Sequence, residues 1–371
     1  FEDYGLFTQV EQLNKTALKA HGLDKSGHLY KVNSFDFHRY EDTIKLADDP
    51  DYNQASFEGM LEIKGDTDHT KLIEMLDALN DESQKIDDVL DTYFDTENLV
   101  YWLAFQILTG NCDTQNRNCY LYSPLNSKVW YILDWDNDGM LRKLELSLTG
   151  FSDYASWERG ASNYWGNVLF NRALRSKSFR SELDRAVKDL RSYLTETRLT
   201  KMIKHYREVT ESLVFASPDI DNLPVTKDQY EQIAAAIPAE IEENYKSFRE
   251  SYKKPMPFYI GVPQIDNGKL RINWDASYDF EARDIRYTVE LARDYAISDV
   301  VFKAEDVLLP EVTCDAPDTG QYFVRVRATN SDGYTQDAFE YYVTDDGKQY
   351  GMKCFYVQDG GKVVEDTYEE G

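Results

Sequence analysis

The chain has 371 residues, and its 41 Lys and Arg against 67 Asp and Glu give a formal net charge of −26 at pH 7. A protein this acidic has no general electrostatic attraction for nucleic acid or for an anionic membrane surface, so those partners are excluded. Hydrophobic residues make up 42% of the chain, which excludes wholesale disorder. No apolar run of about 18 residues occurs, so we expect no spanning helix.

The first segments predict a small mixed α/β region. Residues 4–10 form a β-rich run, residues 14–21 a short helix that stops at Gly22, and residues 28–32 a strand. Residues 36–68 are acidic and predict irregular structure. From residue 69 the apolar positions repeat with a helical period, which predicts helices up to about residue 90.

A mostly apolar helix follows, and its composition predicts that it is buried. It begins at Thr96, which we expect to be its N-cap, and ends at Gly110. Two strands come next, 119–123 and 128–133, and the turn between them predicts a hairpin. Residues 166–250 then carry the pattern of three or four amphipathic helices.

The region after residue 257 predicts an all-β domain, because short period-two strands alternate with turns. Prolines and charges at 253–258 mark the boundary. The clearest strands are 269–274, 285–291, 321–328 and 339–343. We expect Trp274 in the core of a sandwich and Tyr322 at a tyrosine corner. Residues 320–333 resemble fibronectin type III, and the tail from Gly347 predicts one more hairpin across 359–361.

The segment from Asn111 to Gly139 carries the pattern with most chemical content. Asp113 follows the buried helix, Asn118 comes five residues later, and the second hairpin strand ends at Asp134. Protein kinases use this order of a catalytic-loop Asp, a metal-binding Asn and a metal-binding Asp after the next hairpin. Phosphoryl transfer needs mainly that hydroxyl, metal and γ-phosphate are held in line, and one rigid loop beside a hairpin can do this.

The same carboxylates fit a second pattern. Asp134, Asp136, Asp138 and Gly139, with Glu145 at position twelve, match the EF-hand calcium loop. An EF-hand requires a helix before its loop, whereas residues 129–133 predict a strand. The calcium loop therefore stays the alternative to a kinase-type magnesium site.

Several motifs in order resemble the spore coat protein CotH family, whose members have an atypical kinase-like fold and are secreted or lie on a surface. The motifs lie at 4–12, 27–31, 109–113, 117–122 and 133–136. The resemblance covers roughly residues 1–250. It implies ATP- and metal-dependent phosphorylation of protein Ser or Thr. It also implies an incomplete N-terminal lobe, because the family's upstream Arg-Gly-Asn-Ser-like turn and phosphate-contacting Lys have no counterpart in this sequence.

The resemblance implies a role for each candidate residue. Asp113 is the expected catalytic base, and the expected ligands of Mg²⁺ or Mn²⁺ are Asn118 and Asp134, with Asp136 as a further candidate. Glu11, where a kinase-like hinge would meet adenine, and Lys31 are the candidate nucleotide contacts; both also fit ordinary surface residues. The family commonly has a tryptophan before its Asp-x-Asp, and this chain has Leu133.

The four cysteines do not indicate whether the protein is found in an oxidising or a reducing compartment. Cys112, Cys119, Cys314 and Cys354 form no C-x-x-C motif, and with five histidines in the chain we expect no zinc site. One pair in each half would suit an oxidising setting, and free thiols in a reducing cytosol suit the spacing equally well. In a secreted protein, a bridge between Cys112 and Cys119 would brace the candidate loop.

The sequence thus predicts an α+β chain: an atypical protein-kinase-like fold with a helical C-lobe, followed by an all-β immunoglobulin-like sandwich. The expected divisions are 1–252, 257–346 and a tail at 347–371. The expected function is that of a secreted, cell-surface or spore-coat bacterial kinase acting on protein Ser/Thr. The alternative is a non-catalytic surface protein in which a degenerate kinase fold binds a partner or glycan.

Overall fold

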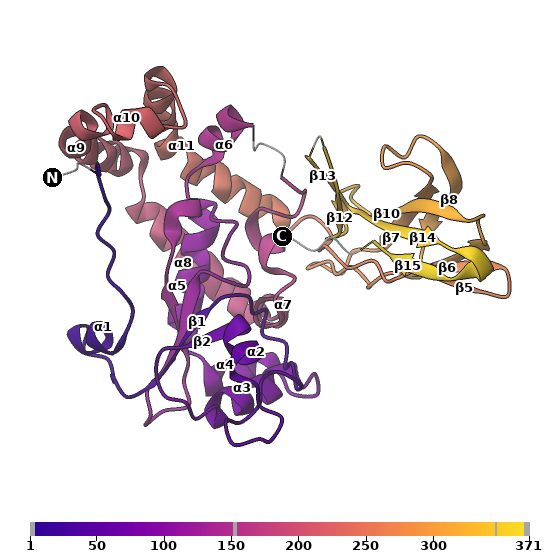
Figure 1. The fold of residues 1–371 in the computed structure, drawn as a ribbon, viewed down its shortest axis with the longest axis horizontal. Helices are drawn as coiled ribbons and strands as arrows, with labels where there is room; N and C mark the ends of the chain where they lie inside the picture. Colours follow the sequence, from indigo (N-terminus) through magenta and orange to yellow (C-terminus); the bar gives the residue numbers. More distant parts are fainter. Residues whose placement is uncertain (1–3, 151–153, 346, 367–371) are drawn as a thin grey trace. The chain divides into compact units, whose positions relative to one another are not determined.

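The structure is a computed structural model, and it describes residues 4–150, 154–345 and 347–366 (Figure 1). The chain is a mixed helix and sheet protein that divides into two compact units. The first unit holds Phe1–Ser152 and Gly166–Lys246, and the second holds Asp153–Trp165 and Ser247–Gly371. The short segment before Gly166 therefore belongs with the β-rich unit, although it lies in the sequence among the helices of the first.

The first unit contains one antiparallel sheet of four strands in the order β2-β1-β3-β4. The strands are β1 (His28–Val32), β2 (Leu61–Ile63), β3 (Cys119–Ser123) and β4 (Tyr131–Asp134). The predicted hairpin is confirmed, since β3 pairs with β4 and places Cys119 opposite Asp134. The β1–β3 pairing sets Lys31 opposite Tyr120 and so brings the early strand beside the candidate loop.

Helices make up most of the rest of this unit. They are α1 (Lys15–Ala20), α2 (Gln54–Met60), α3 (Thr70–Asn80), α4 (Ile86–Tyr93), α5 (Thr96–Thr109), α6 (Lys143–Thr149), α7 (Val168–Arg175), α8 (Lys177–Tyr193), α9 (Glu196–Val214), α10 (Asp219–Asn222) and α11 (Lys227–Ser251). The predicted helix at 14–21 is confirmed, and so is the helical character of 166–250, where the structure has five helices in place of the three or four that we expected. Two expectations are wrong: residues 4–10 form no strand, and residues 36–68 contain α2 and β2.

Helix α5 is the buried centre of the unit, as its composition predicts. Nine of its residues are buried, and it packs against α8 and β4. The ring of Trp102 stacks on Phe170 of α7 with centroids 5.6 Å apart. Gly110 ends the helix at a φ of 66°, a left-handed conformation that glycine adopts without a steric penalty. The helix therefore delivers the following loop from a rigid base.

The N-cap of α5 is Asp95, one residue before the Thr96 that we expected. The Asp95 carboxylate accepts a hydrogen bond from the backbone N–H of Asn98 at 2.9 Å. We expect Asp95→Ala to lower the free energy of unfolding by about 1 kcal/mol, because one helix-terminal N–H loses its partner. Thr96→Ala should change it by less than about 0.5 kcal/mol. Urea unfolding of both variants checks this, and equal losses would contradict the Asp95 cap.

One buried histidine, His28, is the first residue of β1, and another, His69, lies at the start of α3. His69 is fully buried, and its Nδ1 and Nε2 lie 2.9 Å and 3.3 Å from the hydroxyl oxygens of Tyr30 and Tyr52. A neutral ring suits both contacts, since one nitrogen donates and the other accepts. The Nδ1 of His28 is buried without a hydrogen-bond partner. Burial is the main cause that lowers the pKa of both rings, because it penalises the charged form.

These histidines predict that the protein loses stability in acid. The unfolded chain takes up protons from about pH 6.5 downward, whereas the folded state resists protonation until lower pH. The free energy of unfolding should therefore fall below pH 6.5, by about 1.4 kcal/mol per pH unit for each histidine concerned. His28→Gln should reduce this slope, and His205→Gln, at an exposed position, should not. Denaturation between pH 5 and 8 measures it; an unchanged slope in His28→Gln would contradict the assignment.

The described part of the second unit is built mainly from β-strands, with 3₁₀ turns at Gly160–Tyr164 and Asp359–Gly361. The strands are β5 (Gln264–Asp266), β6 (Lys269–Asn273), β7 (Ile285–Ala292), β8 (Val300–Val307), β9 (Glu311–Asp315), β10 (Gly320–Asn330), β11 (Thr335–Asp337), β12 (Tyr341–Thr344), β13 (Gly347–Tyr350), β14 (Met352–Val357) and β15 (Val363–Glu365). A six-stranded sheet runs β15-β14-β10-β7-β8 with β11 beside β10, and a three-stranded sheet runs β5-β6-β9. The strands β5, β8, β9, β11 and β13 were not predicted.

One hydrophobic core joins the two sheets. Trp274, as predicted, is buried in it together with Tyr287 and Val326. The Tyr322 hydroxyl donates to the backbone oxygen of Asp318 at 3.0 Å, which is the hydrogen bond of a tyrosine corner. Residues 347–371, which we expected to be a separate tail, contribute β14 and β15 to the six-stranded sheet. β14 pairs with β10, and the predicted last hairpin joins β14 to β15.

None of the four cysteines forms a disulfide, so the bridge between Cys112 and Cys119 that a secreted protein could have is absent. Cys119 is a buried residue of β3, and burial raises the pKa of its thiol to about 12. Its side chain is therefore an unreactive part of the core beneath the candidate site.

Candidate active site

The loop between α5 and β3 holds Asp113 and Asn118 against each other. The Asn118 Nδ2 donates to the Asp113 Oδ2 at 2.8 Å and to the Asp113 backbone oxygen at 3.1 Å. Asn118 has a φ of 59°, a left-handed conformation that asparagine tolerates better than most residues. The turn thereby folds the amide back onto the carboxylate. Two residues five apart in the sequence thus form one polar pair.

Arg117 completes the surroundings of the Asp113 carboxylate. Its Nε lies 2.8 Å from Oδ1, so both carboxylate oxygens have a partner, and both side chains are about half exposed. An exposed ion pair is worth little in stability. The effect of this pair is local: the Arg117 guanidinium offsets the negative charge of Asp113, which lies near other carboxylates.

Asp134, at the end of β4, is held by two amides. Gln106 of α5 donates through Nε2 to Oδ1 at 2.7 Å, and Asn137 donates through Nδ2 to Oδ2 at 2.7 Å. Burial raises the pKa of the Asp134 carboxyl, and the bonds from Asn137 and Gln106 counteract that rise. The Asp134 residue is solvent-exposed, and its carboxylate is oriented by two amides, so it can serve as a ligand for a divalent cation.

A chain of amides links Asp134 to Asp113. Asn111 donates through Nδ2 to the Asn137 Oδ1 at 3.5 Å, and its own Oδ1 accepts from the Asp113 backbone N–H at 3.3 Å. Gly139 lies so close that an added Cβ would sit 2.7 Å from the Asn111 Oδ1. The loop after β4 therefore packs directly on the loop that carries Asp113.

Asp136 and Lys31 lie at the edge of this group. Asp136 has a φ of 55°, a left-handed backbone that is uncommon for a residue other than glycine and often found at functional sites. Burial, then the charges of Asp138 and Asp113, raise the pKa of the Asp136 carboxyl, and Lys31 lowers it. The Lys31 Nζ lies 5.8 Å from the centroid of the Trp135 ring. The structure thus brings Lys31 to the acidic loop.

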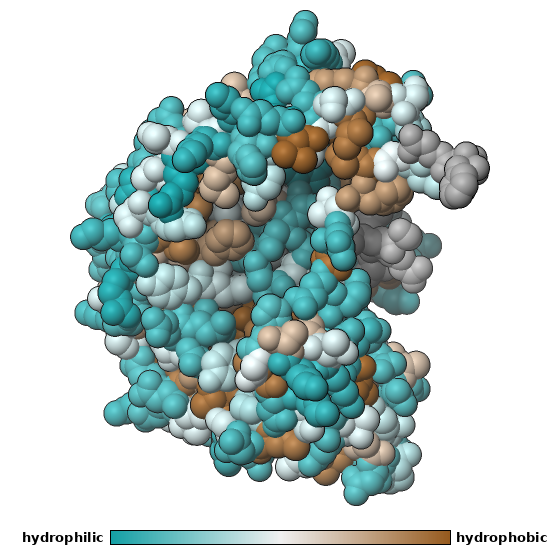
Figure 2. Space-filling model, turned by 90° about the vertical axis from the view of Figure 1, so that its left-hand side faces the viewer, coloured by the Kyte–Doolittle hydropathy of each residue, from teal (hydrophilic) through white to brown (hydrophobic). Residues whose placement is uncertain are grey.

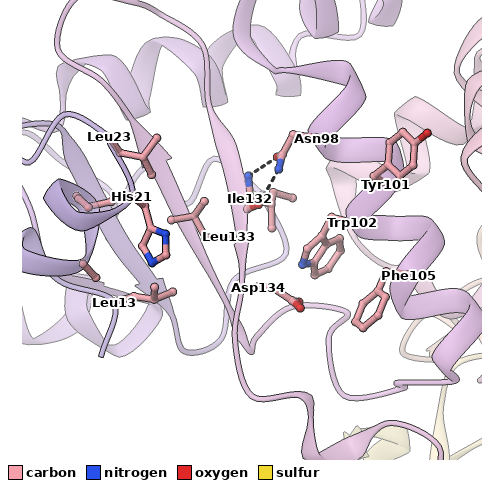
Figure 3. A pocket seen from close by; sticks show the side chains of 12 residues that line it. Leu13, His21, Leu23, Asn98, Tyr101, Trp102, Phe105, Ile132, Leu133 and Asp134 are labelled. Atoms are coloured by element: carbon pink, nitrogen blue, oxygen red, sulfur yellow. Dashed lines mark hydrogen bonds between the residues drawn. The ribbon is translucent and has the colours of Figure 1, made fainter. Parts of the chain in front are cut away.

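An apolar cavity of about 410 Å³ opens beside Asp134 (Figure 3). Its walls come from the α1 region, α5 and β4, with these lining residues: Leu13, Ala17, Leu18, His21, Leu23, Asn98, Tyr101, Trp102, Phe105, Ile132, Leu133 and Asp134. Figure 3 shows the Asp134 carboxylate near Trp102 and Phe105 at one end of the cavity. A flat apolar ligand group would fit between the walls, with its polar part toward Asp134.

Glu11 stands apart from the other candidates. Its carboxylate contacts the Nε2 of His21 at 2.7 Å, and both side chains are more than half exposed. His21 lines the cavity and Glu11 does not. Glu11 therefore contacts a residue of the cavity wall without lining the cavity itself, and it makes no contact with Asp113, Asn118 or Asp134.

The donors fit a magnesium site completed by phosphate better than a calcium cage. No three His, Cys, Asp or Glu side chains within 4–150, 154–345 and 347–366 are placed to hold a metal ion together. Glu145, the twelfth position of the calcium pattern, pairs with Arg142 at 2.8 Å, and strand β4 precedes the loop in place of a helix. Magnesium uses one or two carboxylates plus phosphate oxygens and water, and Asp134 and the Asn118 side-chain oxygen supply suitable donors.

Three residues of the site were missed by sequence reasoning: Gln106, Asn111 and Asn137. Gln106 is a polar residue in a helix that is otherwise apolar on nearly every face, and it is fully buried. A buried amide without a local partner is the signal that could have identified it. Asn111 and Asn137 lie within the motif, but only their contacts separate them from ordinary turn residues.

The comparisons with known proteins give one family. The family model described as CotH kinase protein matches residues 2–248. No curated protein matches the chain. Among solved structures, the chain is similar to the twitchin kinase region from C. elegans at 19% identity and a TM-score of 0.20, over 26% of this chain and 20% of that chain. Because the family model spans more than half of the sequence, including every candidate residue, the chain belongs to the CotH kinase family.

Proposed function

We propose that the protein transfers the γ-phosphate of ATP to a Ser or Thr hydroxyl of a protein substrate. The observation that carries the proposal is the pairing of Asp113 with Asn118 at 2.8 Å, linked through Asn111 and Asn137 to Asp134 at the mouth of an apolar cavity. This is the arrangement that in-line phosphoryl transfer requires: a base, metal ligands and a place for a nucleobase.

Each residue has a defined part in this reaction. The cavity walls hold the adenine, Asp134 and Asn118 hold the metal with Asp136 nearby, and Lys31 and Arg117 offset the charge of the phosphates. Magnesium, when bound, neutralises the phosphate oxygens. Asp113 accepts the proton of the substrate hydroxyl; that oxygen bonds to the γ-phosphorus as the bond to the bridging oxygen of ADP breaks.

A second candidate is a binding protein without catalysis. Its support is that both oxygens of Asp113 already have partners, Arg117 and Asn118, so the base is not free in this arrangement. In that case the fold would present a surface to a protein or glycan.

For the second unit we propose a fibronectin type III-like sandwich that spaces or attaches the kinase unit. Support comes from two sheets around one core, the buried Trp274 and the Tyr322 corner. We place the protein outside the cell, at a surface or spore coat, on the basis of its family. None of the helices in the described part of the chain is long and apolar enough to cross a membrane.

The test is incubation of the purified chain with γ-labelled ATP, magnesium or manganese, and Ser/Thr-containing proteins. We expect label on Ser or Thr that requires the metal, and loss of the label on chelation. Binding of a fluorescent ATP analogue is measured in parallel. Absence of both label and nucleotide binding would overturn the kinase function and favour the binding protein.

A further inference from the structure

His21 contributes a polar ring to a cavity wall that is otherwise mostly apolar. It caps the C-terminal end of α1, and its side chain is 61% exposed. Figure 3 shows the imidazole on the α1 side of the cavity, across from Trp102 and Phe105 of α5. Figure 2, which looks onto the side that carries α1, shows mostly hydrophilic residues with apolar ones among them. A cavity with apolar walls and a few placed polar groups is the usual form of a small-molecule site.

Two other polar side chains of the wall already have partners within the first unit. Asn98 donates through Nδ2 to the backbone oxygen of Ile132 at 3.1 Å, and its Oδ1 accepts from the Ile132 N–H at 2.8 Å. The Tyr101 hydroxyl donates to the Asp189 Oδ2 at 2.9 Å. These contacts hold both side chains against their own chain, so neither is placed to read the edge of a ligand.

Glu11 determines which nitrogen of His21 carries the proton. The Glu11 Oε2 lies 2.7 Å from the His21 Nε2. An ionised carboxylate can only accept a hydrogen bond, so in the neutral ring the proton lies on Nε2. The Nδ1 then carries a lone pair and is an acceptor. Among the residues that the structure describes, Nδ1 has no hydrogen-bond or ion-pair partner, so it is left for a ligand.

An acceptor at this place distinguishes one purine base from another. Adenine carries an amino group at position six, which donates, whereas guanine carries an oxygen there, which accepts. Two acceptors that face each other leave both without a partner and so lower the affinity. The Nδ1 of a neutral His21 therefore favours a base with an amino group over a base with an oxygen at that position.

We propose that His21 is a specificity-determining residue that selects adenine nucleotides by accepting a hydrogen bond from the amino group of the base. Glu11 is its positioning residue, since it acts through the imidazole and does not line the cavity. The inference rests on the proposed binding of ATP in this cavity and names the group that reads the base. The phosphates would extend toward Asp134, which lies on another wall (Figure 3).

Competition against a fluorescent ATP analogue tests the proposal on the full chain. ATP, GTP and ITP are compared with magnesium at pH 8, where an ordinary histidine is neutral. ITP isolates position six, because it has the oxygen of guanine there and lacks the second amino group of guanine. We expect ATP to bind about tenfold more tightly than ITP, because one hydrogen bond is replaced by two opposed acceptors.

Variants of the pair test the residues. His21→Ala should reduce the preference for ATP over ITP to within about twofold, because the acceptor is gone. Glu11→Gln should also reduce it, because an amide both donates and accepts and no longer fixes the proton on Nε2. Gln12→Ala, at an exposed neighbour that does not line the cavity, should keep the wild-type preference. A merely structural role of His21 would weaken ATP and ITP alike and leave their ratio unchanged.

Equal affinity of the wild type for ATP and ITP would overturn the proposal while leaving nucleotide binding, and with it the proposed function, in place. A preference that survives His21→Ala would overturn it too. A preference lost in His21→Ala but kept in Glu11→Gln would remove Glu11 from its positioning role. If the fluorescent analogue itself does not bind, the proposal and the proposed function fail together, and this result is distinct because no displacement can then be measured with any nucleotide.

Discussion

Asp113→Asn should lower the rate of phosphoryl transfer by about a thousandfold, in the range measured for loss of a general base. The amide has nearly the shape of the carboxylate, and its oxygen can keep the contact with Asn118, whereas its NH2 group cannot accept from Arg117, so that exposed ion pair is lost. The amide also cannot accept the proton of the attacking hydroxyl. Nucleotide binding should change little, since the residue acts on the acceptor side. Turnover with labelled ATP and nucleotide affinity are measured on the same preparation.

Asp91→Asn is the matched control, since Asp91 is an exposed carboxylate of α4 away from the loop. It should leave turnover unchanged. If Asp113→Asn transfers phosphate as fast as the wild type, Asp113 is not the base. If wild-type transfer is present and Asp113→Asn loses nucleotide binding instead, the residue belongs to the nucleotide site.

Asp134→Ala should weaken the binding of magnesium with a non-hydrolysable ATP analogue by about a hundredfold or more. The variant removes the carboxylate that would contact the metal, whereas Gln106→Leu removes only a hydrogen bond to it and should cost about tenfold. Calorimetry with and without the nucleotide measures both. Because burial raises the pKa of Asp134, binding should also weaken as the pH falls, and it should begin to do so at a higher pH than for an ordinary aspartate ligand.

Glu145→Ala separates the magnesium site from a calcium loop. Glu145 pairs with Arg142 and should not affect the metal, whereas Asn118→Ala should weaken binding that depends on the nucleotide. Tight calcium binding without nucleotide, lost in Glu145→Ala and kept in Asn118→Ala, would contradict the magnesium assignment.

Elements with a strong local period could be predicted from the sequence. Helix α5 is apolar on nearly every face and ends at a glycine, and β6, β7 and β10 alternate apolar and polar residues, so each pattern has one structure that satisfies it. β8 shows no such alternation because it is a largely exposed edge strand, held by backbone pairing with β7. Its existence depends on a neighbour that local sequence does not reveal.

Part of the candidate site could likewise be predicted from the sequence, and part of it depends on contacts between distant segments. The order of Asp113, Asn118 and Asp134 around a helix and a hairpin is visible in the sequence, because these residues lie within one short segment. That Lys31 reaches Asp136 depends on the pairing of β1 with β3, whose residues are about ninety positions apart. The cavity likewise requires walls from three separate segments.

The sequence by itself determined the family motif, the buried helix and the hairpin that carry the candidate base and metal ligands. The tertiary structure decided that Asp95 caps α5, that Gln106, Asn111 and Asn137 connect the carboxylates, and that Glu11 stays outside the site. The physical reason is the separation along the chain over which each kind of interaction acts. Periodicity and turn geometry act over a few residues, whereas burial and hydrogen bonding between distant segments exist only once the chain has closed its long loops.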